Sequence, residues 1–289
     1  LGPLYYGYGW YVWKRADDRT IVFHDGSNGI HYASLRLYRD DGRVLTYASN
    51  VSAFSDTPPV AVLDRLMLGD TVTLPPVVTG VSATAGTWSG RYSDESGNAI
   101  TVANDGSALR ITGTGQRAFT FVTAGNYSMD PVMDSLNAAT TRFHKFSRAG
   151  LGDSATRLVS GSPADVGPVE QRFWARRDSA FGRFEKVEVL GTRAGRQPPP
   201  FPATTYVAVH FARGTAWREF VWDSTRTIVD YGPLDAPPFR RFYPTSGDCV
   251  TAVDAATARS TSVCFRGTGP SMHAELQAPS GSRRMVRRP

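Results

Sequence analysis

The chain has 289 residues, a mass of 31.5 kDa and a formal net charge of +6, with 41% hydrophobic and 11% aromatic residues. This length accommodates about two domains of about 100–200 residues each, and the composition excludes a chain that is disordered throughout. No stretch reaches the roughly 18 consecutive apolar residues of a membrane-spanning helix. Four arginines near the C-terminus (Arg283, Arg284, Arg287 and Arg288) supply most of the net charge, and no basic stripe interleaved with aromatic residues is present, so we expect no nucleic-acid binding.

Residues 1–69 predict an antiparallel meander followed by a helix. The turn Arg39–Gly42 separates two runs that alternate in hydropathy, as in a hairpin. The expected strands are Tyr6–Trp13, Thr20–His24, Ile30–Tyr38 and Arg43–Ala48. A capping residue, Ser55 or Asp56, then precedes Pro58 and Pro59, which predicts a helix that Gly69 ends.

The region after residue 69 predicts a linker and two further domains. Residues 70–84 carry two prolines and no helical periodicity, which is typical of an extended linker. Short strands over residues 85–127, at 87–92, 99–103, 108–111 and 118–122, predict a small β unit. A basic, flexible tail is expected over residues 275–289.

Residues 128–274 predict helices followed by an antiparallel sheet. Ser128 or Asp130, ahead of Pro131, can start a helix that runs to about Phe146, and further helices are expected near 153–159 and 168–177. The expected strands cover 184–190, 205–211, 217–222, 227–231, 249–253 and 262–266. This order predicts an α+β fold class for the chain. It also suits a cone-shaped accessory domain similar to the nuclear-transport-factor-like family, in which a curved sheet wraps a helix.

The two cysteines flank a probable turn at residues 254–260. A hairpin there would bring Cys249 and Cys264 together as a cross-strand disulfide, and the alternative is a pair of small buried thiols in a reduced protein. The disulfide favours a periplasmic or secreted location over a reducing compartment. The histidines show no recognisable metal-ligand spacing, so neither a metal nor a cofactor is expected.

Three motifs occur in a family-specific order in the first 50 residues. They are Tyr6-Gly7-Tyr8-Gly9-Trp10, then Phe23-His24-Asp25-Gly26-Ser27-Asn28-Gly29, then Tyr47-Ala48-Ser49-Asn50. This order resembles the end of the β-lactamase-like serine hydrolases, which include class C β-lactamases, D-aminopeptidases and related esterases. The resemblance covers residues 1 to about 69 and implies that His24, Asp25 and Gly26 form the family's His-x-Gly box.

The resemblance also implies a role for each residue of the box. His24 would contact the substrate or assist proton transfer, although an ordinary hydrogen-bonded strand histidine is the alternative. Gly26 would let the substrate approach the backbone because it has no Cβ. The Ser27 N–H would be one of two donors to the oxyanion. His24, Gly26 and Ser27 are thus the expected catalytic residues, and Asp25 and Asn28 are expected to bind substrate.

The family's nucleophile box, Ser-x-x-Lys, does not occur in this chain. Its only lysines are Lys14, Lys145 and Lys186, and Tyr11, Arg142 and Arg183 stand three positions before them. We therefore expect a C-terminal fragment of a serine hydrolase that is inactive alone, whose intact parent acts on a small peptide, β-lactam or ester. Self-association through the uncovered sheet is expected for the isolated chain. The alternative is a non-catalytic module that binds a ligand or partner through residues 128–274.

Overall fold

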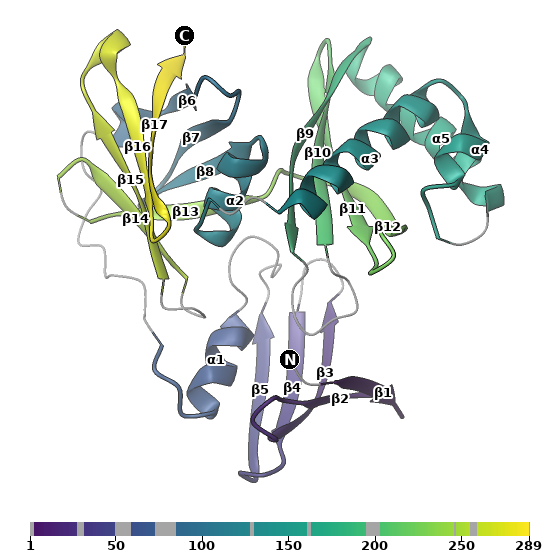
Figure 1. Cartoon of the computed structure of the whole chain (residues 1–289), viewed down its shortest axis with the longest axis vertical. Coiled ribbons are helices and arrows are strands. Elements are labelled where there is room, and N and C mark those ends of the chain that lie inside the picture. The colour runs from purple at the N-terminus through teal and green to yellow at the C-terminus, as the bar shows by residue number, and fades with distance from the viewer. Residues whose placement is uncertain are drawn as a thin grey trace. The chain divides into compact units, whose positions relative to one another are not determined.

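The computed structural model describes residues 3–27, 32–49, 59–72, 85–127, 130–160, 163–194, 203–245, 247–254 and 259–288 (Figure 1). The chain divides into two units, residues 1–77 with 253–260 and residues 78–252 with 261–289. Strands account for 50% of the structure and helices for 25%. The expected α+β class is therefore wrong, and the chain is mostly β. The reason is long-range pairing, because strands far apart in sequence close into one barrel.

The first unit is a five-stranded antiparallel meander with one helix. A meander was predicted, but the single strand expected over Tyr6–Trp13 is instead two paired strands, with Tyr8 and Gly9 at positive φ between them. Its strands pair in the order β1 (Leu4–Gly7), β2 (Trp10–Lys14), β3 (Thr20–Ser27), β4 (Tyr32–Tyr38) and β5 (Arg43–Ser49). Helix α1 (Pro59–Met67) follows, and the residues expected to start it, 55–58, lie outside the described residues. Alternate residues of β3 and β4 (Ile21, Phe23 and Tyr38) form a buried cluster with Leu68 at the end of α1.

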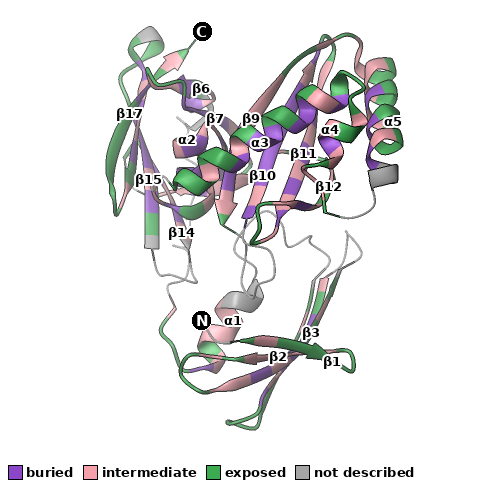
Figure 2. Ribbon diagram, turned by 45° about the vertical axis from the view of Figure 1, so that its right-hand side comes forward, coloured by how far each residue is buried: buried purple, intermediate pink, exposed green. Residues whose placement is uncertain are grey.

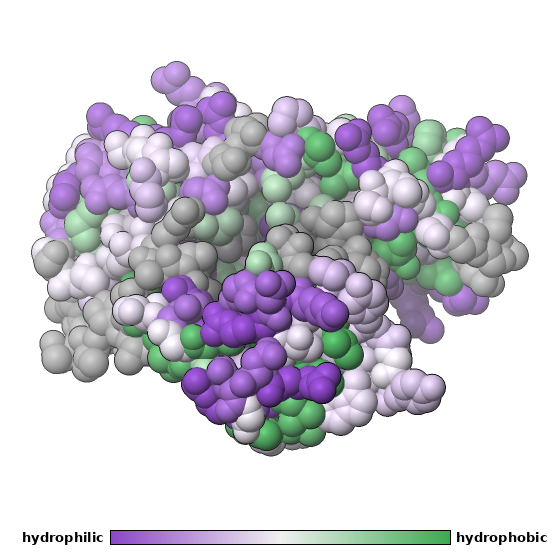
Figure 3. Space-filling model, turned by 60° about the horizontal axis from the view of Figure 1, so that its bottom comes forward, coloured by the Kyte–Doolittle hydropathy of each residue, from purple (hydrophilic) through white to green (hydrophobic). Residues whose placement is uncertain are grey.

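Polar pairs occupy the turns of this meander. Asp17 binds both Arg15 and Arg19 in the β2–β3 turn, and Arg43 lies 3.5 Å from Asp41 in the β4–β5 turn. Figure 3 shows hydrophilic side chains gathered at the end of the unit that faces the viewer. These pairs are exposed, so each contributes little to stability.

The second unit contains a closed eight-stranded barrel. Its strands, in order around the barrel, are β13 (Phe239–Pro244), β14 (Cys249–Asp254), β15 (Arg259–Arg266), β16 (His273–Ala278), β17 (Gly281–Arg288), β6 (Gly90–Ser93), β7 (Ala99–Asp105) and β8 (Ala108–Thr114). Two short 3-10 turns, Ala85–Trp88 and Gly269–Ser271, flank strands of the barrel. Aromatic side chains such as Tyr92, Phe242 and Phe265 fill its interior.

The barrel corrects three expectations about domains. The strands expected at 249–253 and 262–266, in an accessory domain over residues 128–274, are barrel strands β14 and β15. The strands expected to form a small separate unit over residues 85–127 are instead three of the eight barrel strands, β6–β8. The expected flexible tail is instead structured, because β17 pairs with both β16 and β6. The arginines near Met285 led to the prediction of a solvated tail, but Met285 of β17 is buried in the barrel core.

Helix α2 (Gln116–Ala124) replaces the strand expected over residues 118–122. A short apolar run does not distinguish a buried strand from a buried helix. Here, opposite sides of the run are buried by different partners. Ala118, Phe121 and Val122 join the barrel core, and Phe119 packs against Tyr206 of a second sheet.

That second sheet has the order β12 (Ile228–Leu234), β11 (Gly214–Trp222), β10 (Ala203–Phe211) and β9 (Phe184–Ala194). Helices α3 (Pro131–Arg148), α4 (Gly152–Thr156) and α5 (Pro163–Phe181) precede it, in agreement with the expected helices. The cap of α3 follows the sequence, because Asp130 accepts from the Val132 N–H and Pro131 is the first helical residue. Figure 2 shows a largely buried β10 and exposed outer sides on α3 and α5.

A disulfide joins Cys249 of β14 to Cys264 of β15, which decides between the two alternatives for the cysteines. Because the bond closes a 15-residue separation, reduction is expected to lower the free energy of unfolding by about 3 kcal/mol. Urea unfolding with and without a reductant measures the effect. A Cys249→Ser/Cys264→Ser variant is the control and should not respond to the reductant. Equal midpoints for oxidised and reduced wild-type chain would contradict the prediction.

Candidate functional site

The His-x-Gly box, residues 24–26, lies near the end of β3. His24 and Gly26 pair with Leu35 and Ala33 of β4, whereas Asp25 pairs with Ser34. Because successive residues of a strand point to opposite faces, His24 and Gly26 share one face and Asp25 lies on the other. Helix α1 packs on the face of Asp25, as its Leu68 end and Asp64 contacts show. We call the face of His24 and Gly26 the far face.

The box occupies a segment of β3 that has a described strand on one side only. Strand β2 pairs with β3 over residues 20–23, whereas β4 pairs with it over residues 21–27. Backbone groups of residues 25–27 on the β2 side therefore have no strand partner among the described strands. A Cβ added at Gly26 would meet nothing within 4 Å, so this chain does not itself require glycine there.

His24 is exposed, and its ring is fixed to the β1–β2 turn. The Nδ1 atom lies 2.6 Å from the carbonyl oxygen of Gly9, so Nδ1 donates, and Nε2 has no partner among the residues that the structure describes. Ser27 belongs to β3 through its backbone, and Asn28 lies outside the described residues. The structure therefore brings His24, Gly26 and the Ser27 backbone together and gives no position for Asn28.

Asp25 is held on the covered face by a polar network. Its Oδ1 accepts from the Ser34 hydroxyl at 2.5 Å, and its Oδ2 accepts from Arg36 Nη2 at 2.9 Å. Arg36 also donates from Nη1 to Asp64 Oδ2 of α1 at 2.7 Å, and the Tyr38 hydroxyl donates to the other oxygen of Asp64. Burial raises the pKa of Asp64 and of Tyr38. Asp25, expected to bind substrate, thus has its side-chain oxygens engaged within the protein.

A second polar cluster lies in the core between the helices and the second sheet. Arg218 of β11 donates from Nη1 and Nη2 to the two Glu170 carboxylate oxygens of α5, at 2.9 and 2.6 Å. Each residue is only 2% exposed. The Arg218 guanidinium also lies 4.1 Å from the centre of the Phe173 ring. Sequence analysis missed this pair, although Arg218 occupies a core-facing position in the alternating run Ala216–Trp222.

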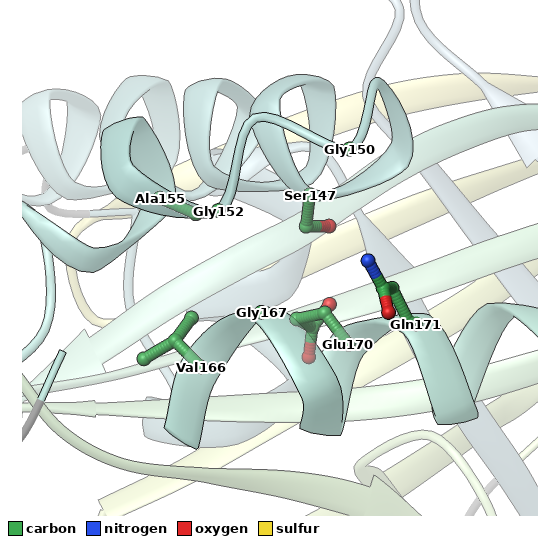
Figure 4. A pocket seen from close by; sticks show the side chains of 8 residues that line it. All are labelled: Ser147, Gly150, Gly152, Ala155, Val166, Gly167, Glu170 and Gln171. Carbon is green, nitrogen blue, oxygen red and sulfur yellow. The ribbon is translucent and has the colours of Figure 1, made fainter. Parts of the chain in front are cut away.

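A pocket opens beside this pair, with an empty volume of about 280 Å³ that includes solvent-open space (Figure 4). Its lining residues are Ser147, Gly150, Gly152, Ala155, Val166, Gly167, Glu170 and Gln171. Glu170 already binds Arg218, and the Ser147 hydroxyl accepts from Trp174 Nε1 at 3.0 Å. The enclosed space that could hold a ligand is only about 40 Å³, far below the roughly 300–1,000 Å³ of drug-sized ligand sites.

The inner face of the second sheet is filled by aromatic side chains from its own helices. Phe143 of α3 packs against Phe220 and Tyr231, and Trp174 of α5 packs against Phe184 and Phe211. A ligand-binding module would instead leave a concave apolar cavity at this face. Among the described residues, side chains of α3 and α5 therefore occupy this face of the sheet.

His144 makes the stability of this core sensitive to acid. Burial and the nearby Arg218 charge lower the pKa of His144 from 6.5 to about 3. Below about pH 6.5 the unfolded chain therefore binds a proton that the folded chain does not, and the free energy of unfolding should fall by up to about 1.4 kcal/mol per pH unit. His144→Phe should flatten this dependence between about pH 6.5 and 4 in urea unfolding. Parallel pH curves for the two proteins would contradict the prediction.

Within the described ranges, no helix has the length and apolarity to cross a membrane. Over the same residues, no cluster of three or more His, Cys, Asp or Glu side chains is arranged to hold a metal ion. Comparison with protein-family models, with curated proteins and with solved structures gives no match to this chain.

Proposed function

We propose that residues 1–69 are the C-terminal part of the catalytic domain of a β-lactamase-like serine hydrolase, which cleaves amides or esters through an acyl-enzyme. The observation that carries the proposal is the placement of the box. His24 and Gly26 share the far face of β3, where one side of the strand has no described neighbour and Gly26 has free space above it. Among the described residues of this unit, nothing occupies the space beside Gly26 that an extended substrate would need to lie against the backbone.

Each group of the box has a role in acyl transfer. The serine nucleophile would come from a segment outside these 289 residues, because the chain has no Ser-x-x-Lys motif. The Ser27 N–H would donate to the oxyanion, a contact whose loss typically costs about 2.7–4 kcal/mol of barrier. His24 would use Nε2 toward the substrate, since Nδ1 is engaged by Gly9. Peptides, β-lactams and esters all share this chemistry.

The test begins with the coding sequence upstream of Leu1. We expect a Ser-x-x-Lys motif there, and we expect the longer protein to be labelled covalently at that serine by a fluorescent penicillin or an ester probe. The absence of such a motif from the same reading frame, or labelling elsewhere, would contradict the proposal.

Gly26→Val distinguishes a functional glycine from a structural one. The added side chain meets open space in this chain, so its stability should change by less than about 0.5 kcal/mol. In the longer protein the same change should slow acylation at least about tenfold, because the side chain occupies the path of the substrate. The matched control is Gly232→Val, another strand glycine with nothing within 4 Å. Equal acylation rates for both variants would contradict a role for Gly26.

A further inference from the structure

At the His-x-Gly box, β3 is paired with β4 but not with β2. Beyond Phe23 no described residue of β2 pairs with β3, so the ladder to β4 is its only described backbone support. Side chains tether the segment on both faces. His24 binds Gly9 on the far face, and Asp25 binds Ser34 and Arg36 on the covered face.

The covered-face tether is built around one buried arginine. Arg36 is 4% exposed, and three of its nitrogens have separate partners. Nε donates to the Ser34 hydroxyl at 3.0 Å, Nη2 donates to Asp25, and Nη1 donates to Asp64 of α1. Its guanidinium carbon also lies 4.6 Å from the centre of the Phe23 ring. Only the forked donors of arginine reach all of these partners, because lysine has a single nitrogen.

The position of Asp25 makes this tether relevant to the box. Asp25 stands between His24 and Gly26, so a rotation of the strand that released its side chain would turn both neighbours on the far face. Both of its carboxylate oxygens are bound, one by Ser34 and one by Arg36. Charge-assisted hydrogen bonds at a mostly buried site are stronger than neutral ones.

We infer that Asp25 and Arg36 are positioning residues, which connect α1 to the back of the His-x-Gly box and hold His24 and the backbone at Ser27 in place. The catalytic consequence rests on the proposed function, whereas the positioning itself does not. Asp25 then acts through its neighbours rather than by touching substrate.

The first experiment uses this chain as it is. Asp25→Asn keeps the size of the side chain and removes the charge that Arg36 binds. We expect amide hydrogen exchange at residues 24–27 to become at least about tenfold faster, since one charge-assisted tether is lost, while exchange in the barrel stays unchanged. The 15N shifts of His24 should also report weaker donation from Nδ1 to Gly9. Asp17→Asn is the matched control, because Asp17 also binds two arginines but in an exposed turn of the same sheet.

The second experiment uses the longer protein. Asp25→Asn should lower the rate of acylation at least about tenfold and change KM by less than about twofold, because misplaced groups weaken the transition state more than the ground state. Asp17→Asn should change neither constant. If Asp25→Asn does not fold, Ser34→Ala takes its place in both experiments, because it removes two bonds of the same tether, one to Asp25 and one from Arg36.

The outcomes separate the two claims. Faster exchange at the box in a longer protein that never forms an acyl-enzyme would support the positioning role and contradict the proposed function. An acyl-enzyme that forms as fast in Asp25→Asn as in wild type, with unchanged exchange at residues 24–27, would overturn the positioning role and leave the proposed function intact.

Discussion

Replacing Arg218 by methionine is expected to lower the free energy of unfolding by about 3–5 kcal/mol. The substitution would leave the Glu170 carboxylate buried without its bidentate partner, since both residues are 2% exposed. It would also remove the guanidinium from the face of Phe173. Urea unfolding monitored by tryptophan fluorescence measures the change, because Trp174 and Trp222 lie in the same core.

Two further variants establish the cause of that loss. A Glu170→Leu/Arg218→Met double variant removes both charges and should recover most of the lost stability, as replacing a whole buried ion pair often does. Arg241→Met removes a partly exposed partner of Asp105 and should cost less than about 1 kcal/mol. A double variant no more stable than Arg218→Met would show that packing, rather than an unpaired charge, causes the loss.

Gly191→Ala is expected to destabilise the chain by about 2–5 kcal/mol, from overpacking together with backbone strain. A Cβ at this position would lie 2.6 Å from the ring of Phe119, which is fully buried between α2 and the second sheet. The backbone of Gly191 also has a φ of +155° beside a register shift in the β9–β10 pairing. Thermal unfolding measures the effect.

The control for Gly191 is another strand glycine. Gly232→Ala places a methyl group where nothing lies within 4 Å and should leave the melting temperature nearly unchanged. Phe119→Leu in the Gly191→Ala background should restore part of the loss, because the shorter side chain gives the new methyl group room. Equal melting temperatures for the two alanine variants would contradict the proposed clash.

Half of the candidate site could be predicted from sequence. Sequence motifs singled out residues 24–26, and strand alternation alone places His24 and Gly26 on one face. The contacts of Asp25 could not be predicted. Arg36 lies 11 residues away and reaches Asp25 only through the pairing of β3 with β4. Asp64 lies 28 residues beyond Arg36 and meets it only when α1 folds onto the sheet. The same holds for Glu170 and Arg218, which are 48 residues apart.

Many of the individual helices and strands follow from short-range sequence signals. Turn residues delimited β4 and β5, and the Asp130–Pro131 cap began α3, since such signals act within a few residues. Three features depend instead on long-range contacts in the folded chain: residues 118–122 are helical, β17 is a strand, and β6–β8 close a barrel with β13–β17. The barrel closes through the pairings β8–β13 and β6–β17, in which each strand binds backbone groups more than 100 residues away. In α2, burial against two different neighbours overrides the local preference of a short apolar run.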